Sequence, residues 1–394
     1  MGQGLRFFAV GLVVSLAAYY AVVVKPGVPF NPAFYAYYPS PPLDSGAFSP
    51  NERLNENTTF YCFPDGAKGP ESFAYDPEAS MLFCGTAEGY IYSLPLPLQS
   101  RTSSPSSPAP SSFKSEVLSS ATPWLFVGGR PLDMDFDAAS ETLVVAEALK
   151  GLMAIDCHQK RVTLLAQNST DGQPIRYANA LSIASTGEIY FSDSSMLPPL
   201  QMDDFTYSTM KTAILDISTA HPSGRLLRYT KEKGAEVMLS NIAYANGVAL
   251  SHDEEFVLIV ETARYRVLRL WLKGERAGTS DVFVDNLPGF PDGISASNDG
   301  SSFWLAILAP RMSLLDLVHP YPSLKKLVSM LPEAIKPKPR PTGHVVKLSR
   351  EGKVLQSLQA QHFPGVSSVS ELGPALYLGN LDSPCFAVVR SSAP

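Results

Sequence analysis

The sequence predicts an all-β fold, a six-bladed β-propeller, preceded by an N-terminal transmembrane anchor helix. Three observations support this prediction. A unit of turn, short apolar strand, polar turn and second strand recurs six times along the chain. The 394 residues include 34 Pro and 27 Gly, which indicate many turns rather than long helices. An unbroken apolar run also lies close to the N-terminus.

The apolar run covers residues 7–24, between Arg6 and Lys25. A helix of this length rises about 27 Å, which nearly spans a hydrocarbon core of about 30 Å. A cleaved signal peptide is the alternative, but Ala-Val-Val-Val precedes Lys25, where a small-x-small site would be expected. We therefore predict that residues 1–25 form the cytosolic tip and signal anchor of a single-pass type II membrane protein. Its propeller would lie in the lumen of the endoplasmic reticulum or secretory pathway, or outside the cell.

Two segments have compositions that do not favour a packed core. Residues 26–60 are rich in Pro, Tyr and Ser without helical or strand periodicity, and we predict an extended stalk. Residues 100–112 are almost entirely Ser and Pro, which indicates a surface loop. Asn57 and Asn168 each begin an Asn-x-Ser/Thr sequon, so both are predicted glycosylation sites if the propeller faces the lumen.

The repeated unit assigns residues 61–394 to the propeller. Each copy is followed by another short strand, such as GLMAIDC or GRLLRYT. Six such units fit six four-stranded blades around a central channel, whereas an αβ solenoid would need helical periodicity between the strands. The copies begin at GPESFAYDPEASMLFCGT, GRPLDMDFDAASETLVVAE, YANALSIASTGEIYFSD, YANGVALSHDEEFVLIVET, FPDGISASNDGSSFWLAI and FPGVSSVSELGPALYLGN.

Two insertions interrupt the repeats. Residues 196–222 lie within the third blade and residues 311–341 within the fifth. The second insertion has leucines at helical spacing around a Pro-Tyr-Pro break. We expect it to cover one mouth of the channel. The alternative is membrane contact through Lys325 and Lys326.

Charge and motifs exclude several classes of protein. A net charge of −6 without a Lys/Arg block argues against nucleic-acid binding. The chain lacks G-x-S-x-G, H-E-x-x-H, P-loop and C-x-x-C motifs. Asp133, Asp135 and Asp137 resemble the start of an EF-hand loop, but Ala138 and Val144 stand where that loop needs Gly and Glu.

The four cysteines are too few for a disulfide scaffold and too widely spaced for a zinc ribbon. If residues near 60 complete the last blade, Cys62 comes close to the C-terminal strand that begins at Cys385, or to Cys84. A disulfide within a sheet is then possible, provided that the Cα atoms lie within about 7 Å of each other.

Four oxygen-bearing side chains stand at equivalent places in the repeats, at the turn before the innermost strand of a blade. In a propeller such positions converge at one mouth of the channel. Two carboxylates and two amides form a hard oxygen set that suits Ca²⁺ better than Zn²⁺. The alternative is that the Asn and Asp residues only form turns before strands. The four residues are Glu71, Asn179, Asn246 and Asp292.

The motifs KGPES, GGRPL, LVVAEALKGL, EIYFSDSS, YANGVALS, DNLPGFPDGI and LYLGN resemble the strictosidine synthase-like family from about residue 69 to the C-terminus. The resemblance implies a propeller with an N-terminal anchor, related to calcium-dependent lactonases and arylesterases such as gluconolactonases and paraoxonases. It also implies that the residues matching the four named above hold the catalytic metal. Three positions depart from the pattern of relatives. Ala180 and Gly293 replace a common Asp and Asn, and Ser367 stands where strictosidine synthases carry an acid–base Glu.

These observations predict a membrane-anchored, calcium-dependent hydrolase of small-molecule esters or lactones. Glu147, in the region that matches a paraoxonase histidine, is the candidate general base. The first alternative is a membrane-tethered binding or scaffold protein without catalysis. The second is a strictosidine synthase-like lyase, which the replacement at Ser367 disfavours.

Overall fold

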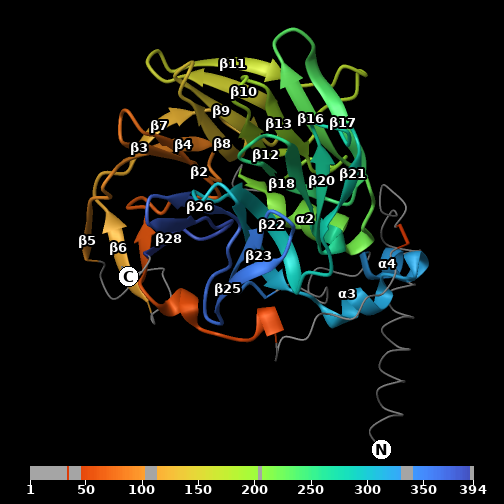
Figure 1. Cartoon of the computed structure of the whole chain (residues 1–394). Coiled ribbons are helices and arrows are strands. Elements are labelled where there is room, and N and C mark those ends of the chain that lie inside the picture. Colours follow the sequence, from red (N-terminus) through yellow and green to blue (C-terminus); the bar gives the residue numbers. More distant parts are fainter. Residues whose placement is uncertain (1–32, 35–45, 103–112, 203–205, 330–339, 391–394) are drawn as a thin grey trace, which may run out of the picture.

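The computed structural model describes residues 33–34, 46–102, 113–202, 206–329 and 340–390. Six antiparallel blades surround a central axis, as Figure 1 shows, which confirms the predicted propeller. The predicted anchor at residues 7–24 and most of the predicted stalk lie outside the described residues. Within the described ranges, no helix has the length and apolar character needed to cross a bilayer.

Each of the first three blades is a four-stranded sheet whose strands follow chain order from the channel outward, although a segment between the third and fourth strands of blade 1 pairs with the last blade. Blade 1 comprises β2 (Phe73–Asp76), β3 (Met81–Gly85), β4 (Tyr90–Pro95) and β7 (Thr122–Phe126). Blade 2 comprises β8 (Pro131–Asp137), β9 (Thr142–Glu147), β10 (Gly151–Asp156) and β11 (Arg161–Ala166). Blade 3 comprises β12 (Ala178–Ile183), β13 (Ile189–Asp193), β16 (Gly224–Thr230) and β17 (Gly234–Ile242).

The remaining blades follow the same order, except that the last one borrows strands from the start of the chain. Blade 4 comprises β18 (Ala245–Leu250), β19 (Phe256–Glu261), β20 (Arg266–Trp271) and β21 (Ser280–Val284). Blade 5 comprises β22 (Gly289–Ala296), β23 (Ser302–Pro310), β24 (Gly343–Ser349) and β25 (Val354–Ala360). Blade 6 comprises β26 (Val369–Leu372), β27 (Ala375–Leu378), β28 (Cys385–Arg390) and β1 (Thr58–Cys62), and β6 (Lys114–Leu118) and β5 (Ser100–Thr102) extend it.

The ring closes where β1 pairs antiparallel with β28. This pairing sets Cys62 opposite Cys385, and the two form a disulfide with their Cα atoms 4.0 Å apart. The pairing of Cys62 with the C-terminal strand is therefore confirmed, and Cys84 is a free, buried thiol. The propeller begins before the predicted residue 61, because β1 starts at Thr58 and Leu54 of η2 (Arg53–Asn55) is fully buried.

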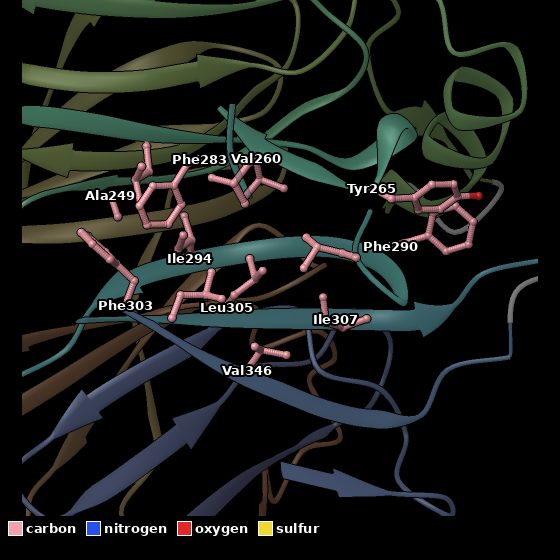
Figure 2. Close-up of a cluster of buried hydrophobic side chains, with 14 of the residues drawn as sticks. Ala249, Val260, Tyr265, Phe283, Phe290, Ile294, Phe303, Leu305, Ile307 and Val346 are labelled. Atoms are coloured by element: carbon pink, nitrogen blue, oxygen red, sulfur yellow. The ribbon is translucent and has the colours of Figure 1, made fainter. Parts of the chain in front are cut away.

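The hydrophobic core lies between neighbouring blades, because alternate side chains of a strand point to opposite faces of its sheet. In β19 every residue is buried. Phe256, Leu258 and Val260 belong to the cluster shared with blade 5, whereas Val257 and Ile259 belong to the cluster shared with blade 3. Figure 2 shows the first of these clusters, where side chains from both blades fill the space between the two sheets.

The two insertions meet in space. The first contains a ribbon of β14 (Leu200–Gln201) and β15 (Tyr207–Ser208), followed by α2 (Thr209–Thr219). The second contains α3 (Ser313–Val318) and α4 (Pro322–Ser329), and α4 packs against α2. The side chain of Lys325 is fully buried, so the alternative in which Lys325 touches the membrane is wrong.

Asp216 of α2 provides a test of this packing. Its side chain is fully buried, and burial raises its pKa from 3.8 to about 7. The native state then holds a proton that the unfolded state releases, so Asp216 lowers stability progressively as pH rises from about 4 to about 7. We expect Asp216→Asn to raise the melting temperature at pH 8 and to change it little at pH 4. Thermal unfolding at both pH values is the measurement, and equal changes at the two would contradict this account.

Candidate functional site

The predicted metal ligands stand near the start of the innermost strand of their blades, or just before it. In blade 3 Leu181 lies opposite Phe191, and in blade 4 Val248 lies opposite Ile259. The predicted ligands of these blades, Asn179 and Asn246, stand two residues before Leu181 and Val248. Glu71, Leu132, Asp292 and Ser367 line the channel near the start of the first strand of the other blades, and we call these four residues, together with Asn179 and Asn246, the ring positions. The four predicted metal ligands therefore occupy four of the six ring positions at the channel mouth.

The four side chains line two cavities at once. On one side lies an apolar cavity beneath α2, whose lining includes Met210, Ile214 and Phe290. Its free volume is about 50 Å³, room for a few water molecules, so a larger substrate must displace part of the α2 cover. On the other side lies the central channel, a cavity of about 250 Å³ whose lining is more polar and includes Asp133, Asp135 and Ser367. The four residues thus mark the boundary between an apolar compartment and a more polar one.

Both asparagines are oriented by a hydroxyl group from the end of the second strand. Asn179 Nδ2 donates to Ser194 Oγ at 2.9 Å, and Ser194 donates to the carbonyl oxygen of Ala245. In the next blade Asn246 Nδ2 lies 3.3 Å from Thr262 Oγ1, which donates to the carbonyl oxygen of Pro291. Because each hydroxyl proton is committed to a backbone carbonyl, each hydroxyl accepts from the amide nitrogen. The amide oxygens are then left for the cavity.

The two carboxylates, when ionised, have little positive charge nearby to balance them. Asp292 accepts a hydrogen bond from Asn246 Nδ2 at 2.5 Å, and burial together with the nearby Glu71 raises its pKa well above the ordinary value. Burial also raises the pKa of Glu71, and Arg130, whose Nη2 lies 3.5 Å from Glu71 Oε2, opposes the shift. One guanidinium at this distance compensates two buried carboxylates poorly, so the set fits a divalent cation.

The amides are essential to such a site. In the described ranges, no cluster of three or more His, Cys, Asp and Glu side chains is placed to hold a metal ion. Only the combination of two carboxylates with the two asparagine oxygens provides enough ligands. This composition matches the hard oxygen set that Ca²⁺ prefers.

Glu147 lies outside both cavities and has a structural environment. Its carboxylate accepts hydrogen bonds from the backbone amides of Arg130, Leu149 and Lys150. Asp193 and Glu261 end the second strands of the next two blades and likewise accept from backbone amides just before the inner strand. Glu147 as a general base stays a prediction, but the structure gives it the turn-stabilising role shared by these repeats.

The structure also reveals functional candidates that the sequence reasoning missed. Arg130, Tyr177, Tyr244 and Phe290 each stand two residues before a ring position, and all but Arg130 line the apolar cavity. Tyr244 Oη donates to Tyr177 Oη at 3.1 Å, which leaves the proton of Tyr177 for another acceptor. The signal available in the sequence was this constant offset of two residues, as in the triplets RPL, YAN and FPD.

The channel side contains two further carboxylates. Asp133 accepts from the amide of Leu181 at 2.8 Å and Asp135 from that of Ile183 at 3.4 Å, so both link blade 2 to blade 3. Burial raises the pKa of Asp133 to about 6 and that of Asp135 to about 7. They line the channel rather than an outer solvated face.

Known structures resemble this fold. A putative gluconolactonase aligns with a TM-score of 0.55 and 14% identity over 84% of this chain and 92% of that one. A gluconolactonase from Xanthomonas campestris gives the same TM-score and identity over 93% and 99% of the two chains. At this identity the likeness shows the propeller fold alone.

Sequence comparison identifies the family. The strictosidine synthase model matches residues 179–275, and the model of the strictosidine synthase-like N-terminal region matches residues 46–94. Strictosidine synthase-like protein 10 of Arabidopsis thaliana is 34% identical over 87% of this chain and 92% of its own length. Adipocyte plasma membrane-associated protein of Bos taurus is 33% identical over 90% of this chain and 83% of its own. On these grounds the chain belongs to the strictosidine synthase-like family.

Proposed function

We propose that this protein hydrolyses ester or lactone bonds of small molecules and uses Ca²⁺ bound by Glu71, Asn179, Asn246 and Asp292. The observation that carries the proposal is the convergence of these side chains between an apolar cavity and a more polar channel. The gluconolactonase fold of the similar structures supports the same reaction class.

The chain's own residues have separable roles in this reaction. Bound Ca²⁺ would polarise the substrate carbonyl and stabilise the negative charge that develops on its oxygen. Glu71 and Asp292 provide the charge that holds the ion, and the hydroxyl-bound asparagines keep neutral oxygens aimed at it. The apolar part of the substrate lies beneath α2, and water reaches the carbonyl from the channel. We assign Glu147 no role in this proposal, because its oxygens accept backbone hydrogen bonds.

Tyr177 is the neighbouring side chain best placed to donate a hydrogen bond to the substrate. Removal of one donor to a developing oxyanion commonly lowers kcat by roughly 100-fold. We expect Tyr177→Phe to lower kcat to about this extent with little change in KM. Tyr244→Phe is the matched control, because it removes the donor to Tyr177 but keeps the Tyr177 hydroxyl, and a smaller loss is expected. Equal rates for wild type and Tyr177→Phe would contradict the role of Tyr177.

The proposal is tested with purified full-length protein on phenyl acetate and a panel of lactones, with added Ca²⁺ and with EDTA. We expect hydrolysis that chelation abolishes and Ca²⁺ restores. Calcium binding without turnover on any substrate would instead support the non-catalytic scaffold function.

We also propose that residues 1–25 anchor the protein with the propeller in the lumen or outside the cell. The disulfide supports an oxidising compartment, and a relative is named as plasma membrane-associated. Asn57, just before β1, and Asn168, after β11, are both exposed and accessible to glycosylation. We expect the protein to resist carbonate extraction and to gain mobility after endoglycosidase treatment. Asn57→Gln/Asn168→Gln should lack this mobility change, and a wild type that also lacks it would contradict the proposed topology.

A further inference from the structure

We propose that the outer face of α3, together with the residue before α4, rests on the surface of the lipid bilayer. This face consists of Leu314, Leu317 and Tyr321, which are 47%, 63% and 58% exposed. Leu314 and Leu317 are three residues apart and share one side of the helix. The opposite side is occupied, because Leu315 and Val318 are buried in the core cluster of blades 4 and 5.

The path of the chain brings this face towards the membrane. The backbone amide of Ala33 donates to the carbonyl oxygen of Thr219, at the end of α2, at 3.1 Å. Seven residues separate Ala33 from the end of the anchor segment 1–25, and seven residues span at most about 25 Å. If residues 7–24 cross the bilayer, the end of α2 lies within about 25 Å of the bilayer surface. The helices α2, α3 and α4, which we call the cap, are then held close to the membrane.

The charge of the second insertion also suits a lipid surface. Besides the buried Lys325, residues 311–341 contain five Lys and Arg residues and two Asp and Glu residues, although the whole chain has a net charge of −6. Basic residues next to exposed leucines and an aromatic ring are typical of segments that lie in the membrane interface. Because the chain path also ties this region to the anchor segment, the occupant that we infer for this face is a bilayer, and contact with another protein is an outcome that the test must separate. This inference goes beyond the proposed hydrolysis and depends only on the anchor.

Fluorescence of a single labelled cysteine can test the inference in the full-length chain. Cys157→Ser removes the partly exposed free thiol, whereas Cys84 is buried and does not react. Leu317→Cys then carries an NBD fluorophore on α3, and the protein is reconstituted in phosphatidylcholine–phosphatidylserine vesicles. We expect the NBD emission to shift to the blue in vesicles. We also expect most of the emission intensity to be lost when the lipids carry a quencher near the headgroup end of their acyl chains.

Leu355→Cys is the matched control, with 58% exposure of the native leucine. The second insertion connects Pro310 at the end of β23 to Gly343 at the start of β24, and Gly343 pairs with Ala360 at the end of β25. Leu355 lies at the opposite end of β25, away from the insertion. We expect no quenching there. The inference would be overturned by equal quenching at both sites or by no quenching at position 317. It would also be overturned by a blue shift at position 317 without lipid quenching, which indicates contact with another protein, or by failure of the chain to float with the vesicles.

Discussion

Replacement of both carboxylates at the channel mouth, in Glu71→Gln/Asp292→Asn, is expected to abolish calcium binding and hydrolysis together. The two side chains supply the negative charge of the site, and the amides that replace them keep its volume. Because both carboxylates are buried with raised pKa values, their removal also relieves repulsion in the metal-free protein. The variant is therefore expected to fold.

Thermal unfolding with and without EDTA measures this effect. Bound metal stabilises the native state by RT ln(1 + [L]/Kd), which is about 2.7 kcal/mol at a hundredfold excess over Kd. Chelation should lower the melting temperature of the wild type and leave that of the double variant almost unchanged. Asp292→Ala should weaken binding more than Asn179→Ala, since it removes charge as well as an oxygen ligand.

A surface double variant serves as the charge-matched control. Asp253 and Glu255 are exposed partners of Arg350, and Asp253→Asn/Glu255→Gln removes the same two charges at the β18–β19 turn, beyond the end of β18 opposite to Asn246. It should keep the full response to EDTA. An equal response in the wild type and in Glu71→Gln/Asp292→Asn would show that any metal binds elsewhere, and the hydrolase proposal would lose its main support.

Removal of the ring-closing disulfide is expected to have the largest effect on stability. Cys62 and Cys385 are 323 residues apart, so their bond constrains nearly the whole unfolded propeller. The chain-entropy model assigns roughly 5 kcal/mol to a loop of more than 100 residues. Cys62→Ser/Cys385→Ser should lower the melting temperature strongly, although the β1–β28 pairing remains.

Reductant provides an internal comparison for the disulfide variant. Dithiothreitol should lower the melting temperature of the wild type but not that of Cys62→Ser/Cys385→Ser. Cys157→Ser, which removes a free thiol, should respond like the wild type. Peptide mapping under non-reducing conditions that finds free Cys62 and Cys385 would contradict the expected bond.

Several features of this protein could be predicted from its sequence because they repeat. A recurring turn–strand–turn–strand pattern predicts one blade, and six copies of it predict a closed ring of six blades. The same repetition identified Glu71, Asn179, Asn246 and Asp292, since equivalent positions in a closed ring meet at one end of the channel. Local patterns also located both insertions and the strand that begins at Cys385.

Other features depend on which distant residues the ring brings together. The sequence left the partner of Cys62 open, and only the pairing of β1 with β28 selected Cys385. The sequence offered Glu147 as the candidate general base, and only the tertiary structure showed that the backbone amides of Leu149 and Lys150 donate hydrogen bonds to it.

The sequence alone therefore determined the blades and the positions of the candidate metal ligands, because each depends on a short repeated pattern. Only the tertiary structure decided how Arg130 approaches Glu71, how Ser194 and Thr262 orient the asparagines, and how α2 covers the site. These contacts join different blades or an insertion to the ring. Their geometry depends on strand register and closure, which no local sequence pattern records.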